Sequence, residues 1–274
     1  MPLVQEILFP VDFSPSSVAL TPVVASMSQR LAAPVTLLRV LSPEAGEAGL
    51  QHAREKLAGF GGPALQAARR EVVFGPPAQA IVKFASGMRS PLIMMPTRGE
   101  SAFRSLLIGS VTAAVLHDVC CPVWTTAHRE AGGPLPADYK SIVCAIDLGA
   151  GSAALLRGAL ELASDLGAQL RVVHSVPGVD PRFESAAANR AHAFLKATAA
   201  DDYAKLAAQN PEMALPPLEI VEEVGLTAGI VAAAERHQAD LLVIGRGVTQ
   251  GVLGRLRTNA HELIRQSPCP VLSI

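Results

Sequence analysis

Short apolar runs alternate with longer amphipathic stretches along the chain, and the pattern begins twice. Residues 7–11 and 142–146 are apolar runs that lead directly into an aspartate, Asp12 and Asp147. A turn rich in Ser or Gly follows, then a stretch with helical character, then a second apolar run. This order predicts a strand, a turn, a helix and a strand, which together form a βαβ unit.

The second half of the chain repeats the first. Residues 7–41 align with residues 142–176 without a gap. The halves also end alike, because residues 92–124 and 241–274 each run from an apolar strand through a polar, glycine-containing loop and a helix to a Cys-Pro-Val edge. The repeat predicts an α/β fold with two tandem doubly wound domains, each a parallel sheet with right-handed crossovers between flanking helices.

The boundary between the halves is visible in the composition. We predict a first domain at residues 1–127, a linker at 128–138 and a second domain at 139–274. The linker contains two glycines and two prolines and has no apolar periodicity. The second half carries a longer insertion, residues 177–218, whose centre is strongly helix-prone.

Composition narrows the function classes. Half of the 274 residues are hydrophobic and the net charge is −1, which argues against disorder and against a strongly basic surface for nucleic acid. The mean hydropathy is +0.33, but the longest charge-free run, residues 13–29, is broken by Ser, Thr and Pro, so no membrane-spanning helix is predicted. The N-terminus has no signal peptide, and the four cysteines lack framework spacing, so we expect a cytoplasmic protein.

Asp12 and Asp147 are the first candidate site residues. Each follows the first predicted strand of its half, and ligands of open α/β sheets bind at the carboxyl ends of such strands, near the switch in strand order. A carboxylate there can accept a hydrogen bond from an amine or a ribose hydroxyl. The alternative is an Asp that caps the following helix, with Pro15 at the first helical position.

A second candidate lies in residues 99–112. Gly99 follows a predicted strand, and Gly109 and Ser110 open the next helix. Glycine lets backbone N–H groups approach a phosphate, and the helix N-terminus contributes partial positive charge. The alternative is an ordinary capped helix with Ser110 as the N-cap. In the second half, Gly245 lies in the loop and Arg257 and Thr258 stand where Gly109 and Ser110 would fall.

Catalytic signatures are missing from the sequence. It contains no phosphate-binding G-x-x-x-x-G-K-[ST] loop, no G-x-S-x-G elbow and no H-E-x-x-H zinc helix. His117, Asp118, Cys120 and Cys121 crowd together but lack metal-ligand spacing, so no metal site is predicted. The sequence therefore predicts a binding protein which, if it takes a nucleotide, hydrolyses it slowly at most.

Together these residues resemble the universal stress protein family. Residues 7–12 look like the family's opening strand, and Gly99, nine residues, Gly109-Ser110 and then Cys121-Pro122-Val123 resemble its closing motif, G-x-x-G, nine residues, G-[ST]. Both halves carry the resemblance, so the chain looks like a tandem universal stress protein. The family implies a five-stranded parallel sheet in the order 3-2-1-4-5. It also implies pairing of two domains through their last strands, here within one chain, with a homodimer as a further possibility.

Many family members bind ATP, and the resemblance assigns residues to that ligand. Asp12 would meet the adenine or ribose, Val40 would lie near the base, and Gly99, Gly109 and Ser110 would hold the phosphates, with Mg²⁺ accompanying them. In the second half the corresponding residues are Asp147, Gly245 and Thr258. The motif departs from the family at Pro96, which replaces the leading glycine and removes an N–H donor, and at Arg257, which replaces the last glycine.

The resulting prediction is a stress-response module that binds ATP, more readily in the first half, and contacts unknown protein partners. Three alternatives stay open on the sequence. The first is a protein-interaction scaffold with eroded nucleotide sites. The second is an enzyme of the wider adenine-nucleotide α-hydrolase group. The third is a binder of a small apolar ligand between the domains or under residues 177–218.

Overall fold

The structure, a computed structural model, describes residues 2–97, 108–126, 138–179, 182, 185–246 and 255–274, with backbone alone at 255–258. The chain divides into two compact units, Met1–Asp138 and Tyr139–Ile274, which we call unit 1 and unit 2. The predicted linker lies almost wholly outside the described residues.

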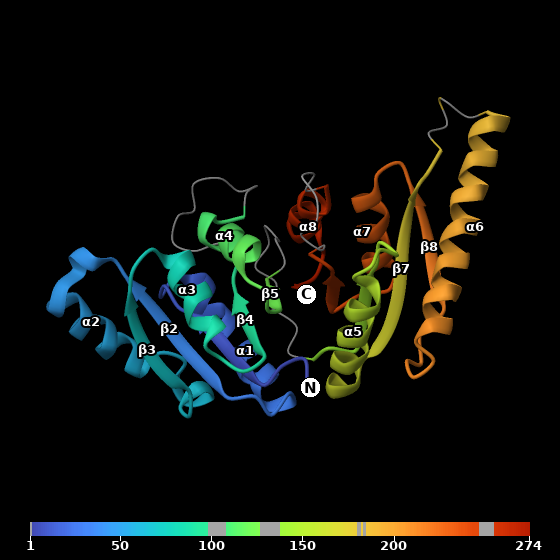
Figure 1. Cartoon of the computed structure of the whole chain (residues 1–274). Coiled ribbons are helices and arrows are strands. Elements are labelled where there is room, and N and C mark those ends of the chain that lie inside the picture. The colour runs from blue at the N-terminus through green and yellow to red at the C-terminus, as the bar shows by residue number, and fades with distance from the viewer. Residues whose placement is uncertain (1, 98–107, 127–137, 180–181, 183–184, 247–254) are drawn as a thin grey trace. The chain divides into compact units, whose positions relative to one another are not determined.

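Unit 1 is built on five parallel strands in the order β3-β2-β1-β4-β5 (Figure 1). The central strands are apolar on both sides, and every residue of β4 is buried, as expected where helices cover both faces of a parallel sheet. The strands are β1 (Glu6–Pro10), β2 (Val35–Leu41), β3 (Arg69–Phe74), β4 (Pro91–Met95) and β5 (Val123–Thr125).

The helices of unit 1 connect these strands in chain order. The pattern in residues 72–85, a strand, a glycine and a helix, appears as β3, Gly75 at φ 139° and the following helix. The helical elements are α1 (Pro15–Arg30), η1 (Pro43–Ala45), α2 (Gly46–Gly59), η2 (Gly62–Leu65), α3 (Pro77–Ser86) and α4 (Ser110–Asp118).

Unit 2 repeats the arrangement, with parallel strands in the order β10-β9-β6-β7-β8. Its strands are β6 (Ser141–Ala145), β7 (Gln169–Pro177), β8 (Leu218–Glu223), β9 (Leu241–Ile244) and β10 (Val271–Ser273), and its helices are α5 (Ser152–Leu166), α6 (Ala186–Gln209), α7 (Leu226–Arg236) and α8 (Arg255–Gln266). In both units the order corresponds to 3-2-1-4-5. The predicted fold class, two doubly wound parallel α/β domains, is confirmed.

The insertion of unit 2 forms the long helix α6, as its composition predicted. Ser185 caps the helix by accepting a hydrogen bond from Ala188 N at 3.1 Å. Polar contacts attach α6 to the sheet, because His192 Nε2 lies 2.7 Å from Glu222 Oε2 and Lys196 pairs with the same carboxylate. Phe194 on the outer side of α6 is 70% exposed, so only one stripe of the helix is packed.

The strand order fixes where a ligand can lie. In unit 1 the chain leaves β1 for β2 on one side, whereas β4 pairs with β1 on the other side. The connections after β1 and β4 therefore diverge at the carboxyl edge of the sheet, which is the switch point at which open α/β sheets bind ligands. In unit 2 the same position lies between β6 and β9.

Candidate functional site

Asp12 braces the turn between β1 and α1. Its Oδ1 accepts hydrogen bonds from Ser14 N at 3.0 Å and from Ser17 Oγ at 2.6 Å. The helix cap is Ser14, whose Oγ accepts from Ser17 N at 3.2 Å, and Pro15 begins the helix as expected. The interpretation of Asp12 as the cap is therefore wrong. Asp12 lies two residues before the cap and reaches the N–H of the cap residue itself.

The Asp12 carboxylate is poised to accept one more hydrogen bond. Burial raises its pKa, but the hydrogen bonds from Ser14 and Ser17 lower it, and the net shift is downward from the usual 3.8. The group is therefore ionised at neutral pH although it is only partly exposed. Among the described residues nothing donates to its Oδ2, so this oxygen can take a donor such as a ribose hydroxyl.

In unit 2 the equivalent aspartate makes the same hydrogen bonds but is more exposed to solvent. Asp147 Oδ1 accepts from Gly149 N at 2.9 Å and from Ser152 Oγ at 3.1 Å. These contacts match those of Asp12, but Asp147 is exposed where Asp12 is half-buried. The two halves thus share the geometry of the turn and differ in how far the carboxylate is shielded from water.

The residue after each aspartate adopts a left-handed backbone conformation. Phe13 has φ 66° and Leu148 has φ 59°. Such values are rare for residues that carry a Cβ, and for a bulky side chain they mark local strain that the surrounding structure must hold. Because the strain occurs at equivalent positions, it belongs to the turn itself, where it directs the aspartate back toward the helix N-terminus.

Across the switch point, hydrogen bonds tie the start of α4 to the end of β4. Gly109 N donates to Thr97 O at 2.8 Å, and Thr112 Oγ1 donates to Pro96 O at 3.0 Å. Gly109 is the N-cap and the exposed Ser110 is the first helical residue. The alternative of Ser110 as the cap is therefore wrong by one position. Gly99 lies outside the described residues.

The amino end of α4 has the features of an anion site. The first N–H groups of a helix lack intrahelical acceptors, and the helix dipole adds partial positive charge there. Gly109 places no side chain over this end, and no acidic residue occupies the first turn. The Pro96 carbonyl accepts the Thr112 hydroxyl; any residue at position 96 would offer this carbonyl, so what proline removes there is only the N–H donor.

Val40 lies near the end of β2, beside β1. It pairs with Val73 of β3 and is half-buried. The gapless alignment places Ser175 of β7 at the equivalent position in unit 2. Ser175 is 7% exposed, and its Oγ has no hydrogen-bond partner among the described residues.

The structure describes only some of the candidate site residues of unit 2. Gly245 follows β9 and is half-buried, with Leu155 Cδ2 3.3 Å from the place a Cβ would occupy. Thr258 and Arg257 lie in the first turn of α8, but their side chains are outside the described residues. The structure therefore brings Asp147 and Gly245 to the ends of adjacent strands, β6 and β9.

Sequence reasoning missed a basic and aromatic cluster beside Asp12. Arg39 Cζ lies 5.1 Å from the ring centroid of Phe13, and Lys56 Nζ lies 5.8 Å from the same centroid. Phe60 packs edge-on against Phe13 with centroids 5.8 Å apart. These residues come from the β1–α1 turn, β2, α2 and the segment after α2. Of these residues, only Arg39 could have been noticed in the sequence, because it directly precedes the candidate residue Val40.

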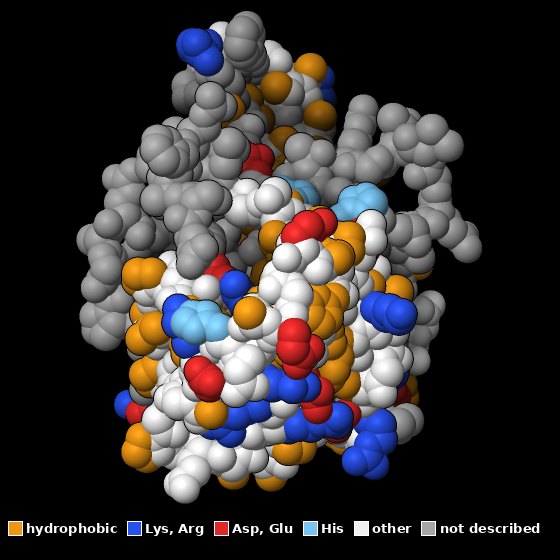
Figure 2. Space-filling model, turned by 90° about the vertical axis from the view of Figure 1, so that its left-hand side faces the viewer, with side chains coloured by type: hydrophobic (Ala, Val, Ile, Leu, Met, Phe, Trp, Pro, Cys, Tyr) orange, Lys and Arg blue, Asp and Glu red, His pale blue; other side chains and the backbone are white. Residues whose placement is uncertain are grey.

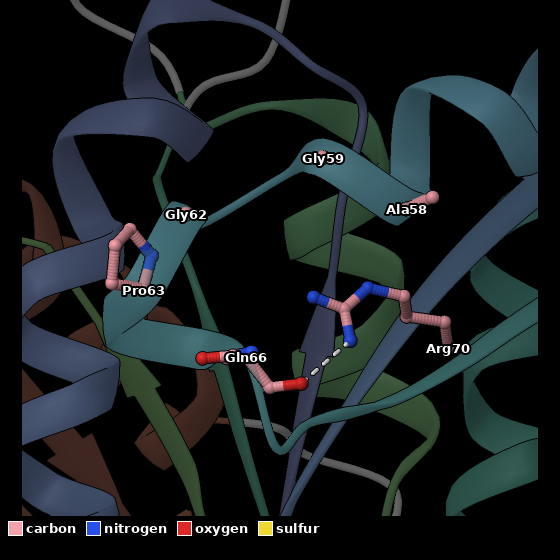
Figure 3. A pocket seen from close by; sticks show the side chains of 6 residues that line it. All are labelled: Ala58, Gly59, Gly62, Pro63, Gln66 and Arg70. Carbon is pink, nitrogen blue, oxygen red and sulfur yellow. Dashed lines mark hydrogen bonds between the residues drawn. The ribbon is translucent and has the colours of Figure 1, made fainter.

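Unit 1 also has a shallow hollow of about 420 Å³ (Figure 3). It is formed by residues at the end of α2, in η2 and at Arg70. The guanidinium of Arg70 donates to four backbone carbonyls, those of Leu57, Leu65, Gln66 and Ala68, over 2.7–3.3 Å. Because its guanidinium donors are occupied by these carbonyls, we assign Arg70 a structural role: it links η2 to α2.

Figure 2 shows one face of the molecule, on which basic and acidic side chains lie side by side. Unit 1 contains an ion pair between Arg69 Nε and Glu71 Oε1 at 2.6 Å. Within the described ranges, no group of three or more His, Cys, Asp or Glu side chains is arranged to hold a metal ion. Nor does any described helix have the length and apolar character needed to cross a membrane.

The fold and the site define a tandem α/β protein whose two switch points carry a serine-braced aspartate. The model of the universal stress protein family matches residues 4–126 and again residues 138–274. The chain therefore belongs to the universal stress protein family and contains two of its domains in tandem.

Three similar proteins can be compared with this chain. Universal stress protein MJ0531 of Methanocaldococcus jannaschii is 40% identical over 53 residues, which span 19% of this chain and 31% of that protein. A universal stress protein from Archaeoglobus fulgidus is 20% identical, with a TM-score of 0.66 over 99% of this chain and 97% of that one, so it shares the fold. A universal stress protein solved in complex with cAMP matches 50% of this chain and 97% of its own, at 17% identity and a TM-score of 0.37.

Proposed function

We propose that unit 1 binds ATP at the switch point between β1 and β4 and that the protein acts as a nucleotide-responsive binding module. The observation that carries the proposal is the pairing of two complementary features at adjacent strand ends. One is the ionised Asp12 carboxylate with an available oxygen, and the other is the open amino end of α4 at Gly109 and Ser110. A nucleoside triphosphate carries a hydroxyl donor and an anionic tail that match them.

In this proposal each part of the ligand has a partner. Asp12 Oδ2 accepts from a ribose hydroxyl, Val40 lies beside the base, and the N–H groups and the Ser110 hydroxyl at the start of α4 bind phosphate oxygens. Gly99 would complete the phosphate loop. Mg²⁺ would arrive with the phosphates, since the described residues supply no carboxylate cluster for it.

Unit 2 is the weaker candidate in this proposal. Asp147 and Gly245 keep two of the elements, with Thr258 as the hydroxyl donor. Asp147 is exposed, however, so water competes for its carboxylate more strongly than at Asp12. We retain the cytoplasm as the proposed compartment because the cysteines lack framework spacing. The expected pairing of the two halves and the homodimer stay predictions.

The test is thermal unfolding and calorimetric titration of the nucleotide-free protein with Mg-ATP. A ligand present at about one hundred times its Kd adds about 2.7 kcal/mol to the native state, which appears as a rise of several degrees in Tm. Three proteins are compared: wild type, Gly109→Asp and Gly109→Asn.

The two variants separate charge from shape. Asp and Asn are both good N-cap residues, so neither should unfold α4, and the Asp charge at the amino end even favours the helix. The Asp carboxylate repels phosphate, whereas the nearly isosteric Asn does not. We expect ATP to raise the Tm of the wild type and of Gly109→Asn. The affinity of Gly109→Asp for ATP should be lower by at least about tenfold, or about 1.4 kcal/mol.

Two results would contradict the proposal. If neither titration heat nor a Tm rise appears in wild-type protein shown to be free of bound nucleotide, unit 1 has no ATP site and the interaction scaffold becomes the better account. If ATP binds equally well to all three proteins, it binds away from the start of α4.

A further inference from the structure

Arg39 contacts the two residues that flank Asp12 in the chain. Its Nη1 donates to the carbonyl of Val11, the residue before Asp12, at 3.3 Å. Its guanidinium carbon lies 5.1 Å from the ring centroid of Phe13, the residue after Asp12. Arg39 therefore contacts the residues on both sides of Asp12, the candidate ribose partner, in the turn where Phe13 is left-handed.

A second cation shares the same ring. Lys56 extends from α2, and its Nζ lies 5.8 Å from the Phe13 centroid. Phe60 supports Phe13 from the edge and packs in the same way on Phe9 of β1, at 6.0 Å, so the ring is anchored to the core. Two basic side chains from different elements are thus directed to one fixed aromatic platform.

Neither cation is neutralised by a carboxylate among the residues that the structure describes. Arg39 contacts the Val11 carbonyl, and its buried Nε has no hydrogen-bond partner there. The neighbouring acidic residue in α2, Glu55, accepts from Gln51 at 2.8 Å. An aromatic face compensates a cation only weakly, so a bound anion would stabilise each of these cations.

The strand order sets the cluster apart from the start of α4. Arg39 stands on β2, which pairs with β1 on one side, whereas α4 follows β4, which pairs with β1 on the other side. Asp12 lies between them at the end of β1. A ligand with its ribose at Asp12 therefore meets an anion-attracting group on each side.

Unit 2 lacks this cluster. Leu148 stands at the position of Phe13, and His174 stands at the position of Arg39, where its Nδ1 lies 2.9 Å from the Ile146 carbonyl. The backbone contact is therefore kept in both halves, but the aromatic platform is found in unit 1 alone of the two equivalent turns.

We propose that Arg39, Lys56 and Phe13 form a binding site for a phosphate on the ribose of the nucleotide, so that unit 1 takes an adenine nucleotide phosphorylated at the 5′ position and also at a ribose hydroxyl. The inference rests on the proposed nucleotide site in unit 1. It narrows the ligand class from adenine nucleotides in general to ribose-phosphorylated ones.

The experiment compares ligands that differ in one phosphate. Isothermal titration of the full chain is carried out with AMP, ADP, adenosine 3′,5′-bisphosphate and adenosine 2′,5′-bisphosphate. We expect at least one bisphosphate to bind about tenfold or more tightly than AMP, the factor given by one charge-assisted hydrogen bond. ADP has the same number of phosphates as the bisphosphates but carries both on the 5′ side, so any gain with ADP reports on the start of α4 and should be unaffected by substitutions in the cluster.

Variants assign any gain to the cluster. Lys56→Gln alters an exposed side chain and is expected to reduce the ratio of bisphosphate affinity to AMP affinity severalfold. Arg39→Gln is expected to bring this ratio to about one. Lys83→Gln is the matched control, because Lys83 is also an exposed lysine on a helix, α3, and its substitution should leave every affinity unchanged. Circular dichroism confirms that each variant is folded.

The outcomes separate this proposal from the one it rests on. Binding of AMP and ADP with no further gain for either bisphosphate overturns the ribose-phosphate site and leaves the nucleotide site standing. Absence of binding by all four ligands and by ATP overturns both. A gain that survives in Lys56→Gln and in Arg39→Gln overturns the assignment to this cluster.

Discussion

Gly229 lets α7 approach β7 closely, and replacing it tests the packing of unit 2. A Cβ at this position would lie 2.7 Å from Ser175 Oγ and 3.2 Å from Val221 Cγ2. The first distance is shorter than any relaxed contact, and Ser175 is buried on a central region of the sheet. We therefore expect Gly229→Ala to push Ser175 or the helix out of place.

Two opposing terms set the magnitude. Alanine in a helix interior is favoured over glycine by about 1 kcal/mol. Overpacking of a buried site costs about 1–3 kcal/mol. The steric term is the larger, so we expect Gly229→Ala to destabilise the protein by about 1 kcal/mol, although in an open helix the same change would stabilise it.

The second substitution is Ser175→Ala. The Ser175 hydroxyl has no hydrogen-bond partner among the described residues, so its removal alone should be neutral or slightly stabilising. It also removes the atom that a Cβ at position 229 would meet. In the Ser175→Ala background we therefore expect Gly229→Ala to change stability by about zero or to increase it, which gives a coupling free energy of about 1–2 kcal/mol.

The assay is urea unfolding followed by far-UV circular dichroism for the four proteins of the cycle. Gly59→Ala is the control, because a Cβ on Gly59 meets nothing within 4 Å, and it should be neutral or stabilising. Equal destabilisation by Gly229→Ala in both backgrounds would refute the argument from Ser175. Destabilisation by Gly59→Ala of the same size would refute the steric explanation altogether.

Three further predictions concern unit 1 and the thiols. Arg70→Lys should destabilise by about 1–2 kcal/mol in urea unfolding, because a lysine cannot reach four carbonyls, whereas Arg69→Lys, which alters an exposed ion pair, should change stability by less than about 0.5 kcal/mol. Asp12→Asn should be less stable than wild type at pH 7. Because the pKa of Asp12 is lowered on folding, its carboxylate contributes stability above pH 3.8, and this contribution is lost as the pH falls through the pKa of the folded protein. The difference in urea midpoint between the two proteins should therefore disappear between pH 7 and pH 2.5. In mass-spectrometric labelling the exposed Cys120 should react in the native protein and Cys144 only after unfolding, because burial raises the pKa of the Cys144 thiol to about 12.

Local sequence patterns were sufficient to predict the repeated fold. The apolar runs became buried strands because a doubly wound sheet covers both faces of its central strands, which leaves little ambiguity in a continuous apolar run. The helix predicted at the centre of residues 177–218 also formed, as α6. Its attachment through His192, Lys196 and Glu222 was not predictable, because the partners lie 26 and 30 residues apart in the chain and meet only after β8 has docked beside β7.

The site was predictable in its positions and not in its contacts. Asp12, Gly109 and Ser110 could be placed at strand and helix ends from spacing alone. The left-handed conformation of Phe13 could not, since Phe is a poor residue for that region and nothing local requires it. The error over the helix caps has the same origin. The cap depends on which oxygen reaches an N–H two or three residues ahead, and the choice between Asp12 and Ser14 is decided in three dimensions.

Comparison of the two halves separates structural from ligand-specific roles at the switch point. The aspartate, its serine donor and the left-handed residue between them occur in both units, with Oγ–Oδ1 distances of 2.6 Å and 3.1 Å. These shared contacts hold the strand-to-helix turn through Oδ1 of the aspartate, and they leave its Oδ2 for the proposed ligand. The neighbours differ, because Arg39 and Phe13 in unit 1 are replaced by His174 and Leu148 in unit 2. Substitutions that change ligand preference without unfolding the turn should therefore be sought at these neighbours, and substitutions of the serines should act first on stability.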